Sequence, residues 1–161
     1  MKTTKLKLLA VIGLYSLSMA ATAAMEDKKE IKAASGGSSV NLPVMQLKYF
    51  DTGIYGSNES VGTLKAAASY GDLQHSMHGT FVKMPAGFVS KGHIHTGEFY
   101  AVVIAGVGVN GLAGSSDVPL PVGSYWSQKG GESHVTKCIS SNECIFFISQ
   151  NSKFDYIFDK K

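Results

Sequence analysis

The sequence predicts an all-β fold of the double-stranded β-helix type, also called a jelly roll. From residue 44 onward, short β-rich runs are separated by Gly, Asn, Asp and Ser clusters about every eight to twelve residues. This spacing is typical of an all-β sandwich or barrel. No segment shows a useful length of apolar residues with a helical period. A jelly roll accommodates the expected number of strands and closes most sheet edges.

The strands are expected, in order, at 45–51, 60–68, 79–84, 92–95, 99–105, 108–112, 124–127, 132–138, 144–150 and 154–158. The second contains the alanine run 66–68 and has the weakest pattern. In the seventh strand, Tyr125 and Trp126 alternate, so only one of them can face the barrel. The predicted domain, 44–161, is long enough for one core and a pocket in the barrel mouth.

The first 43 residues are expected to lie outside this domain. Residues 1–23 have the pattern of a secretory signal peptide: early lysines, an apolar run at 8–19 and small residues at 21–23. An uncleaved anchor is disfavoured because a spanning helix needs roughly 20 apolar residues. Residues 24–43 are charged and then Ala-, Gly- and Ser-rich, which predicts a flexible leader. We therefore expect a periplasmic or secreted bacterial protein without a stable membrane anchor after cleavage.

The charge balance argues against a nucleic-acid partner. The chain has 15 basic and 12 acidic residues, and every basic residue is lysine. Removal of Lys2, Lys5 and Lys7 with the signal peptide leaves the mature chain near neutral. Arginine is the usual reader of phosphate and guanine, and this chain has none. A small organic ligand is the expected partner, and a homo-oligomer stays open.

Three histidines in the β domain have a spacing suited to a metal site. His93 and His95 lie two residues apart in an expected strand, so both imidazoles point to one face. His134 follows about forty residues later, after a Gly-rich turn. Three inward histidines can hold one divalent transition metal, such as Fe, Mn, Zn or Ni, and leave positions for water or substrate. The simpler alternative is a strand with exposed or hydrogen-bonded histidines.

The glycines around these histidines extend the pattern. Five residues separate Gly87 from His93, and sixteen separate Gly106 from Gly123. The chain resembles the two signature motifs of the cupin superfamily, Gly-x5-His-x-His-x(3,4)-Glu-x6-Gly and Gly-x5-Pro-x-Gly-x2-His-x3-Asn. The sequence around these motifs looks most like that of a functionally unassigned bacterial branch of single-domain, RmlC-like cupins. The resemblance covers roughly 78–158 and implies a jelly roll with a metal centre.

The chain departs from these motifs at three positions. Lys129 replaces the proline and Cys138 the asparagine, both usually structural positions. The glutamate is expected at 99 or 100 but occurs as Glu98. On a regular strand Glu98 would point away from the histidines, whereas a bulge at 96–97 would turn it inward. We expect Glu98 as a fourth ligand; the alternative is a solvated or hydrogen-bonded carboxylate.

Three further residues are candidates for the pocket. Gln128 lies six positions before His134 and could hydrogen-bond a ligand or metal-bound water. Tyr100 would face the pocket only if a bulge shifts the strand. His78 precedes an expected strand, where a surface or hydrogen-bonded turn histidine is the alternative.

The two cysteines, Cys138 and Cys144, flank a segment centred on Ser-Ser-Asn that has the pattern of a hairpin turn. Symmetric pairing about Ser141 would place them opposite each other across a β-ladder. Export to an oxidising compartment favours a disulfide. Two free thiols in a small core are the alternative.

These features leave two classes of function open. A metal-dependent enzyme could use Fe for dioxygen chemistry, or Mn, Ni or Zn as a Lewis acid. A non-catalytic module could bind or sense a small molecule or the metal. The sequence shows no evident general acid or base beyond Glu98 and Tyr100, and fold alone does not choose between these classes.

Overall fold

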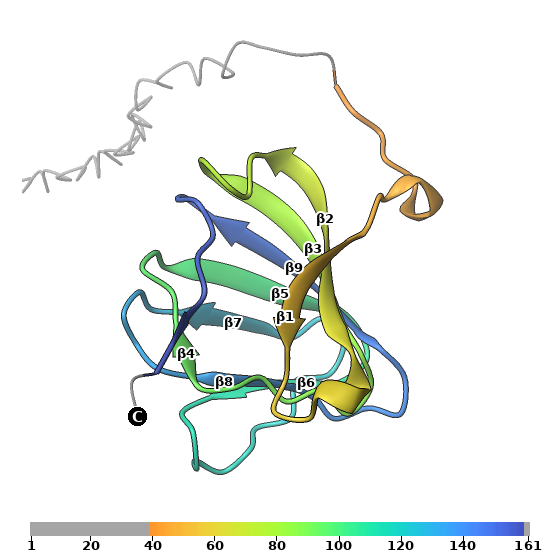
Figure 1. Cartoon of the computed structure of the whole chain (residues 1–161). Helices are drawn as coiled ribbons and strands as arrows, with labels where there is room; N and C mark the ends of the chain where they lie inside the picture. The colour runs from red at the N-terminus through yellow and green to blue at the C-terminus, as the bar shows by residue number, and fades with distance from the viewer. Residues whose placement is uncertain (1–38, 160–161) are drawn as a thin grey trace, which may run out of the picture. The chain divides into compact units, whose positions relative to one another are not determined.

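The computed structural model describes residues 39–159, which form a β-barrel of ten strands and two short 3-10 helices (Figure 1). The helices are η1 (Val44–Gln46) and η2 (Glu59–Val61). The strands are β1 (Phe50–Tyr55), β2 (Thr63–Gly71), β3 (His78–Met84), β4 (His93–Ile94), β5 (Phe99–Ala105), β6 (Gly108–Gly111), β7 (Tyr125–Gln128), β8 (Val135–Cys138), β9 (Cys144–Gln150) and β10 (Ile157–Phe158). The expected signal peptide and most of the expected leader lie outside the described residues.

The strands form two layers. Six antiparallel strands make the large sheet, in the order β1-β2-β3-β9-β5-β7. The second layer contains the pairs β10-β4 and β6-β8, which lie below the large sheet in Figure 1. A reciprocal backbone bridge joins these pairs: the His93 amide donates to the His134 carbonyl at 3.2 Å, and the His134 amide to the His93 carbonyl at 3.0 Å. The bridge places the ends of β4 and β8 side by side.

The core lies between the layers and follows the alternation of each strand. In β9 the inward positions include Phe146, which is fully buried, and its neighbours face outward or are half-buried. Phe88, Val103 and Met84 join the same cluster. Trp126 packs edge-on against Phe146 with ring centroids 5.2 Å apart, whereas Tyr125 is exposed. This cluster does not include the residues of β4, where the candidate functional site lies.

The expected jelly roll is confirmed, although its first strand is displaced and β2, β8 and β10 each begin three residues later than expected. β5 and β9 have the expected bounds, and the alanine run lies in β2. The expected first strand at 45–51 is wrong: η1 occupies its start, and β1 begins only at Phe50. The β1–β2 ladder begins where Phe50 faces Ala66, although β2 continues to Gly71. The residues at the expected start instead form a 3-10 turn, in which the Gln46 amide donates to the Pro43 carbonyl at 2.8 Å and the Leu47 amide to the Val44 carbonyl at 3.3 Å.

The disulfide between Cys138 and Cys144 is present, but its expected geometry is wrong. β8 pairs with β6, and β9 pairs with β3 and β5, so the cysteines are not opposite each other in one ladder. Both are buried, and their bond joins the two layers where the chain passes from β8 to β9. The turn between them changes sheets instead of closing a hairpin.

Within residues 39–159, none of the helices has the length and apolar character needed to cross a membrane.

Candidate metal centre

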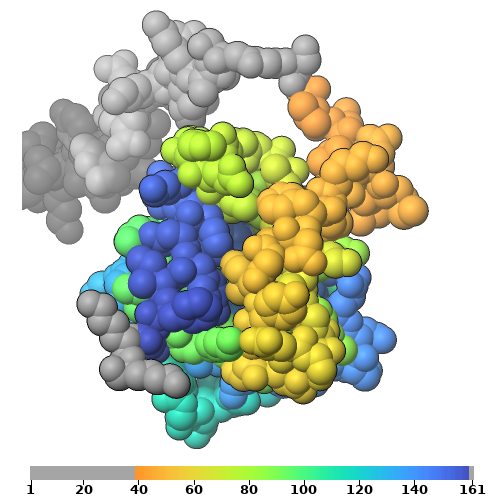
Figure 2. Space-filling model, viewed as in Figure 1, coloured from red at the N-terminus to blue at the C-terminus, as the bar shows by residue number. Residues whose placement is uncertain are grey.

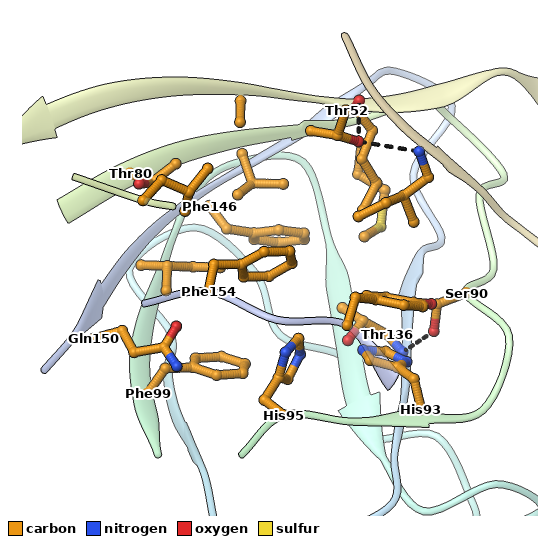
Figure 3. A pocket seen from close by; sticks show the side chains of 18 of the residues that line it. Thr52, Thr80, Ser90, His93, His95, Phe99, Thr136, Phe146, Gln150 and Phe154 are labelled. Atoms are coloured by element: carbon orange, nitrogen blue, oxygen red, sulfur yellow. Dashed lines mark hydrogen bonds between the residues drawn. The ribbon is translucent and has the colours of Figure 1, made fainter. Parts of the chain in front are cut away.

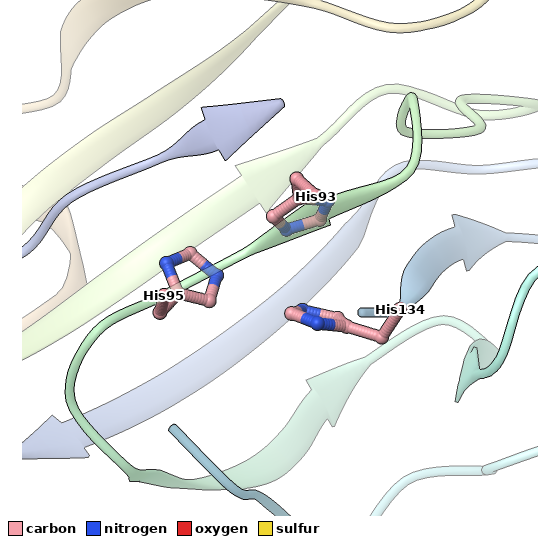
Figure 4. Close-up of side chains that lie close together, drawn as sticks. All are labelled: His93, His95 and His134. Carbon is pink, nitrogen blue, oxygen red and sulfur yellow. The ribbon is translucent and has the colours of Figure 1, made fainter. Parts of the chain in front are cut away.

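The three predicted histidines converge between β4 and β8, with their rings close together (Figure 4). His93 lies in β4, His95 follows that strand directly, and His134 directly precedes β8. All three side chains are buried, and one ring nitrogen from each lies within 4.8 Å of the others. The i, i+2 spacing and the β4–β8 bridge together produce this convergence.

The second ring nitrogen of each histidine is committed to the backbone. His93 Nδ1 donates to the Lys91 carbonyl at 2.9 Å, and His134 Nδ1 to the Glu132 carbonyl at 3.2 Å. His95 Nδ1 donates to the Asp155 carbonyl. A carbonyl accepts only, so each Nδ1 carries the proton and each Nε2 has a free lone pair. Backbone bonds of this kind fix the tautomer and orientation that a metal-ligating histidine needs.

One of these lone pairs gives a direct test of whether the site suits a metal. His134 Nε2 is buried and has no hydrogen-bond partner among the described residues. A buried acceptor without a partner costs free energy, typically about 1–3 kcal/mol. A metal ion bound at Nε2 would remove this cost. The donor set, three neutral imidazoles, suits Zn, Cu, Fe and Ni.

Burial keeps the three imidazoles in the form that binds metal. Burial, together with the neighbouring His134, lowers the pKa of His93 to about 3. Burial likewise lowers the pKa of His134 to about 4, and it lowers the pKa of His95. All three rings are therefore neutral near pH 7, as metal coordination requires.

Gln128 supports His134 from below instead of lining the pocket. Its side-chain amide donates to the Glu132 carbonyl at 3.2 Å, the same carbonyl that His134 uses. Its oxygen accepts from Asn110 at 2.9 Å. The adjacent turn is close to β4, because a Cβ at Gly130 would lie 2.5 Å from the Thr96 carbonyl oxygen. Gln128 is thus buried beside the site, but its contacts are to the turn and to Asn110, and it does not line the cavity.

The C-terminal segment 151–159 supplies contacts that sequence reasoning missed. Tyr156 stacks on His93 with ring centroids 3.9 Å apart and an interplanar angle of 13°. Phe154 packs against His95 at 5.3 Å. The Asp155 carboxylate accepts from the Thr96 amide at 2.9 Å and from its hydroxyl at 2.6 Å. The segment crosses the front of the barrel to reach β4, and it covers that face in Figure 2. The sequence predicted only a strand at 154–158 in this segment, and not its contacts with the histidines.

A cavity extends from the histidines into the barrel (Figure 3). It leaves about 80 Å³ for the centres of water-sized molecules. Its lining residues are Thr52, Ile54, Leu64, Ala66, Leu73, His78, Thr80, Val82, Met84, Ser90, His93, His95, Phe99, Trp126, Thr136, Phe146, Ile148, Gln150, Phe154 and Tyr156. The cavity therefore runs from the metal-binding end to an apolar interior.

His78 is part of this wall. It is buried in β3, where Nε2 donates to Gln150 Oε1 at 3.2 Å and Nδ1 accepts from Thr80 at 2.9 Å. Burial lowers its pKa. In the register of the large sheet, His78 pairs with Gln150, and Gln150 pairs with Phe99. Phe99 lies edge-on to His95 at 5.2 Å, so it separates His78 from the metal-binding end.

The structure does not bring Glu98 or Tyr100 to the histidines. The chain bends at 96–97 on leaving β4, and β5 then begins with Phe99 buried. Because strand neighbours alternate, Glu98 and Tyr100 both face outward. The adjacent Glu98 raises the pKa of Tyr100. The expected inward bulge is thus replaced by a turn between two layers, and the ligand cluster consists of the three histidines alone among the described residues.

Solved structures with this architecture are cupins. The chain is similar to the polyketide cyclase RemF from Streptomyces resistomycificus, with 13% identity over 77% of this chain and 87% of that one, at a TM-score of 0.62. An RmlC-like cupin protein from Ralstonia eutropha is 17% identical over 77% of this chain and 75% of that one, at a TM-score of 0.58. A predicted oxalate decarboxylase from Thermotoga maritima is 19% identical over 70% of this chain and 99% of that one, at a TM-score of 0.55. At these identities the likeness shows the fold, which is that of the cupin superfamily.

The sequence itself defines the family of the chain. Residues 60–159 match the family described as "Domain of unknown function (DUF4437)", and the chain belongs to it. This agrees with the resemblance to a functionally unassigned branch. No curated protein matches the chain in sequence.

Proposed function

We propose that this protein binds one divalent transition metal ion through His93, His95 and His134, and that the ion holds a small organic molecule in the adjoining cavity. The observation that carries the proposal is the shared hydrogen-bond pattern, in which every Nδ1 donates to a backbone carbonyl. This pattern leaves three convergent Nε2 atoms, one of them buried without a partner. Three protein ligands leave coordination positions for a ligand.

The cavity wall bears on the type of chemistry. When bound, a redox-active ion such as Fe supplies dioxygen chemistry, and Mn, Ni or Zn polarises a carbonyl. Carbonyl chemistry also needs a group that moves a proton at the reacting atom. The described lining residues include no carboxylate and no amine. Burial raises the pKa of Tyr156 to about 12, and its hydroxyl points to the Lys91 carbonyl at 3.4 Å. His78 is the one imidazole of the described wall outside the metal-binding end, and Thr80 and Gln150 hold both of its ring nitrogens. We therefore favour an oxygenase over a Lewis-acid enzyme.

The same observation supports a second candidate, a non-catalytic module that binds or senses a small molecule or the metal. A wall whose titratable side chains His78 and Tyr156 are held in hydrogen bonds suits retention of a ligand as well as it suits oxygenation. Dioxygen consumption separates the two candidates: the Fe-loaded protein is supplied with a panel of enols, catechols and small organic acids. Consumption that depends on one of these compounds supports an oxygenase, whereas binding without consumption supports the module.

Metal titration tests the site itself. The wild type is expected to bind one divalent ion, and His134→Ala is expected to lose most of this binding while remaining folded, because the core cluster does not include His134. His75→Ala is the matched control, since His75 is an exposed histidine paired with Asp72 and should not affect metal binding. Stoichiometric metal in His134→Ala would overturn the assignment.

We also propose that the protein is exported, with 1–23 removed and 24–43 acting as a leader to the domain at 44–161. The disulfide between Cys138 and Cys144 supports this proposal, because disulfides persist in oxidising compartments. The lysine-rich start and the apolar run at 8–19 support it from the sequence. A periplasmic or secreted location follows.

A further inference from the structure

The cavity wall carries no formal charge beyond its metal-binding end. None of its described lining residues is Lys, Asp or Glu, and the chain contains no arginine. A charged group on a ligand would therefore lose its hydration without gaining a counter-ion. Burial of an unpaired charge costs several kcal/mol or more. The body of a ligand in this cavity must be uncharged.

The polar side chains of the wall are already engaged with one another or with the backbone. Thr52 donates to the Leu64 carbonyl at 2.8 Å and accepts from an amide at 3.2 Å. The Thr136 hydroxyl donates to Asn110 at 2.7 Å. The Gln150 amide donates to the Gly97 carbonyl at 3.3 Å and to the Ser152 hydroxyl at 3.1 Å.

His78 likewise uses both ring nitrogens within the wall, in hydrogen bonds to Thr80 and Gln150. Away from the histidine cluster, Trp126 Nε1 is the one buried side-chain donor without a partner in the described part of the chain. A sugar or other polyol would bring several hydroxyl groups to a wall that can pair with few of them. The wall therefore behaves as an apolar surface despite its threonines and glutamine.

The size of the cavity limits the body of the ligand. The space of about 80 Å³ is roughly half of the 150 Å³ in which an engineered protein cavity holds benzene. A short branched alkyl group meets this limit, whereas a fused ring or a long chain exceeds it. The aromatic and aliphatic side chains Phe146, Ile148 and Val82 would surround such a group.

We propose that the site takes a small molecule with one oxygen-donor head, which coordinates the metal, and an uncharged alkyl body of about three or four carbon atoms, which fills the apolar cavity. The inference rests on the proposed metal site for the head and on the cavity wall for the body. It excludes polycarboxylates, phosphate esters and sugars as good ligands.

Alkyl hydroxamates test the inference, because all share one metal-chelating head. Calorimetric titration of the metal-loaded protein compares acetohydroxamate, isovaleryl hydroxamate, octanoyl hydroxamate and succinic monohydroxamate, whose body ends in a carboxylate. Each buried methylene is expected to tighten binding roughly fourfold. Isovaleryl hydroxamate should therefore bind at least about tenfold tighter than acetohydroxamate, and the octanoyl and carboxylate probes should lose this gain. Equal affinity for all four probes, or tightest binding of the carboxylate probe, would overturn the inference.

Two wall variants give opposite expectations. Ala66→Leu adds a side chain into the cavity from β2 and should remove the preference for isovaleryl over acetohydroxamate. Ile148→Ala enlarges the cavity from β9 and should shift the preference towards longer chains. If Ala66→Leu fails to fold, Ile148→Ala still decides. A chain-length preference unchanged in a folded variant would overturn the assignment of the body to this cavity.

A metal-free arm separates this inference from the proposed function. The neutral probe 2-methyl-1-propanol is added to metal-free protein, and the methyl resonances of Val82 and Ile148 are followed by NMR, with sodium propionate as the charged comparison. Selective shifts with the alcohol support the apolar cavity even if no metal binds, in which case the proposed function alone fails. Shifts with propionate but not with the alcohol would overturn the cavity inference.

Discussion

His93, His95 and His134 each use one ring nitrogen for the fold and leave the other for a ligand. The carbonyls that accept the hydrogen bonds from the Nδ1–H groups belong to Lys91, Glu132 and Asp155, the last of which lies 60 positions after His95 in the C-terminal segment. Orientation of the rings is therefore set by backbone position instead of by other side chains. Such preorganisation allows the metal-free protein to keep the geometry of the site.

The lowered pKa values of these histidines predict how the metal-free fold responds to acid. The unperturbed pKa is 6.5, whereas the folded values are about 3 for His93 and about 4 for His134. As the pH falls below 6.5, the unfolded chain binds protons that the folded chain does not. The contribution of these histidines to the free energy of unfolding is thus fully present above about pH 6.5, and it is lost as the pH falls towards pH 4 and below.

Urea unfolding of metal-free protein at about pH 7.5, 5.5 and 4.5 checks this expectation. His134→Ala should show a weaker decline, and the exposed-histidine control His75→Ala should match the wild type. The acids Asp51 and Asp72, whose pKa values hydrogen bonds lower below 3.8, act in a lower pH window. A stability that is constant or rises between about pH 7.5 and 4.5 would contradict the assignment.

Glu98 gives a second prediction at the level of one residue. Because it is exposed beside Tyr100, Glu98→Gln should leave metal affinity equal to that of the wild type within about twofold. A ligating carboxylate would instead lose most of its contribution on this change. Parallel metal titrations of the two proteins decide, and a clear loss of affinity in Glu98→Gln would show that the chain turns Glu98 inward when metal binds.

The histidines could be predicted from the sequence because their placement follows from local rules. Two residues at i and i+2 of a strand must share a face, and motif spacing located His134. Glu98 could not be placed in this way, because its direction depends on a turn between two layers. The Asp155 carbonyl is a backbone atom brought in from a distant segment, and no side-chain pattern marks it.

At the level of elements, the passage from β8 to β9 shows why pairing partners are harder to predict than strands. Both strands were expected close to their observed bounds, and so was the disulfide between them. A hairpin was the simplest connection, since only five residues separate Cys138 from Cys144. The observed partners are β6 for β8 and β3 and β5 for β9, which depend on the whole sheet order.

The disulfide closes a short loop, so its loss should have a modest effect. Chain-entropy arguments give roughly 2 kcal/mol of stabilisation for a loop of this size. The double variant Cys138→Ser, Cys144→Ser should lower the free energy of unfolding in urea by about this amount and leave metal stoichiometry unchanged. Thiol counting in denatured, non-reduced wild type should find no free thiol. Two titratable thiols per chain would contradict the bond.

At the level of the whole molecule, the candidate metal centre lies where three regions of the sequence meet. β4 supplies His93 and His95, the entry to β8 supplies His134, and the C-terminal segment packs Tyr156 and Phe154 against them. The large sheet supplies the cavity wall. A single jelly-roll core can therefore carry both the metal-binding end and the apolar pocket, without a second domain.

The proposed export of the whole chain is supported only indirectly by the folded domain. Buried bonds such as that between Cys138 and Cys144 are typical of proteins in oxidising compartments, and the first 23 residues have the pattern of a signal peptide. Expression of the full chain in a bacterium should yield a periplasmic or secreted protein that is lighter by about 2.4 kDa through cleavage near Ala23. Intact mass spectrometry measures this loss. As a control, Ala21→Lys with Ala23→Lys removes the small residues of the cleavage signal and should leave the precursor uncut. A wild-type chain that keeps its full mass and stays with the membrane fraction would contradict export.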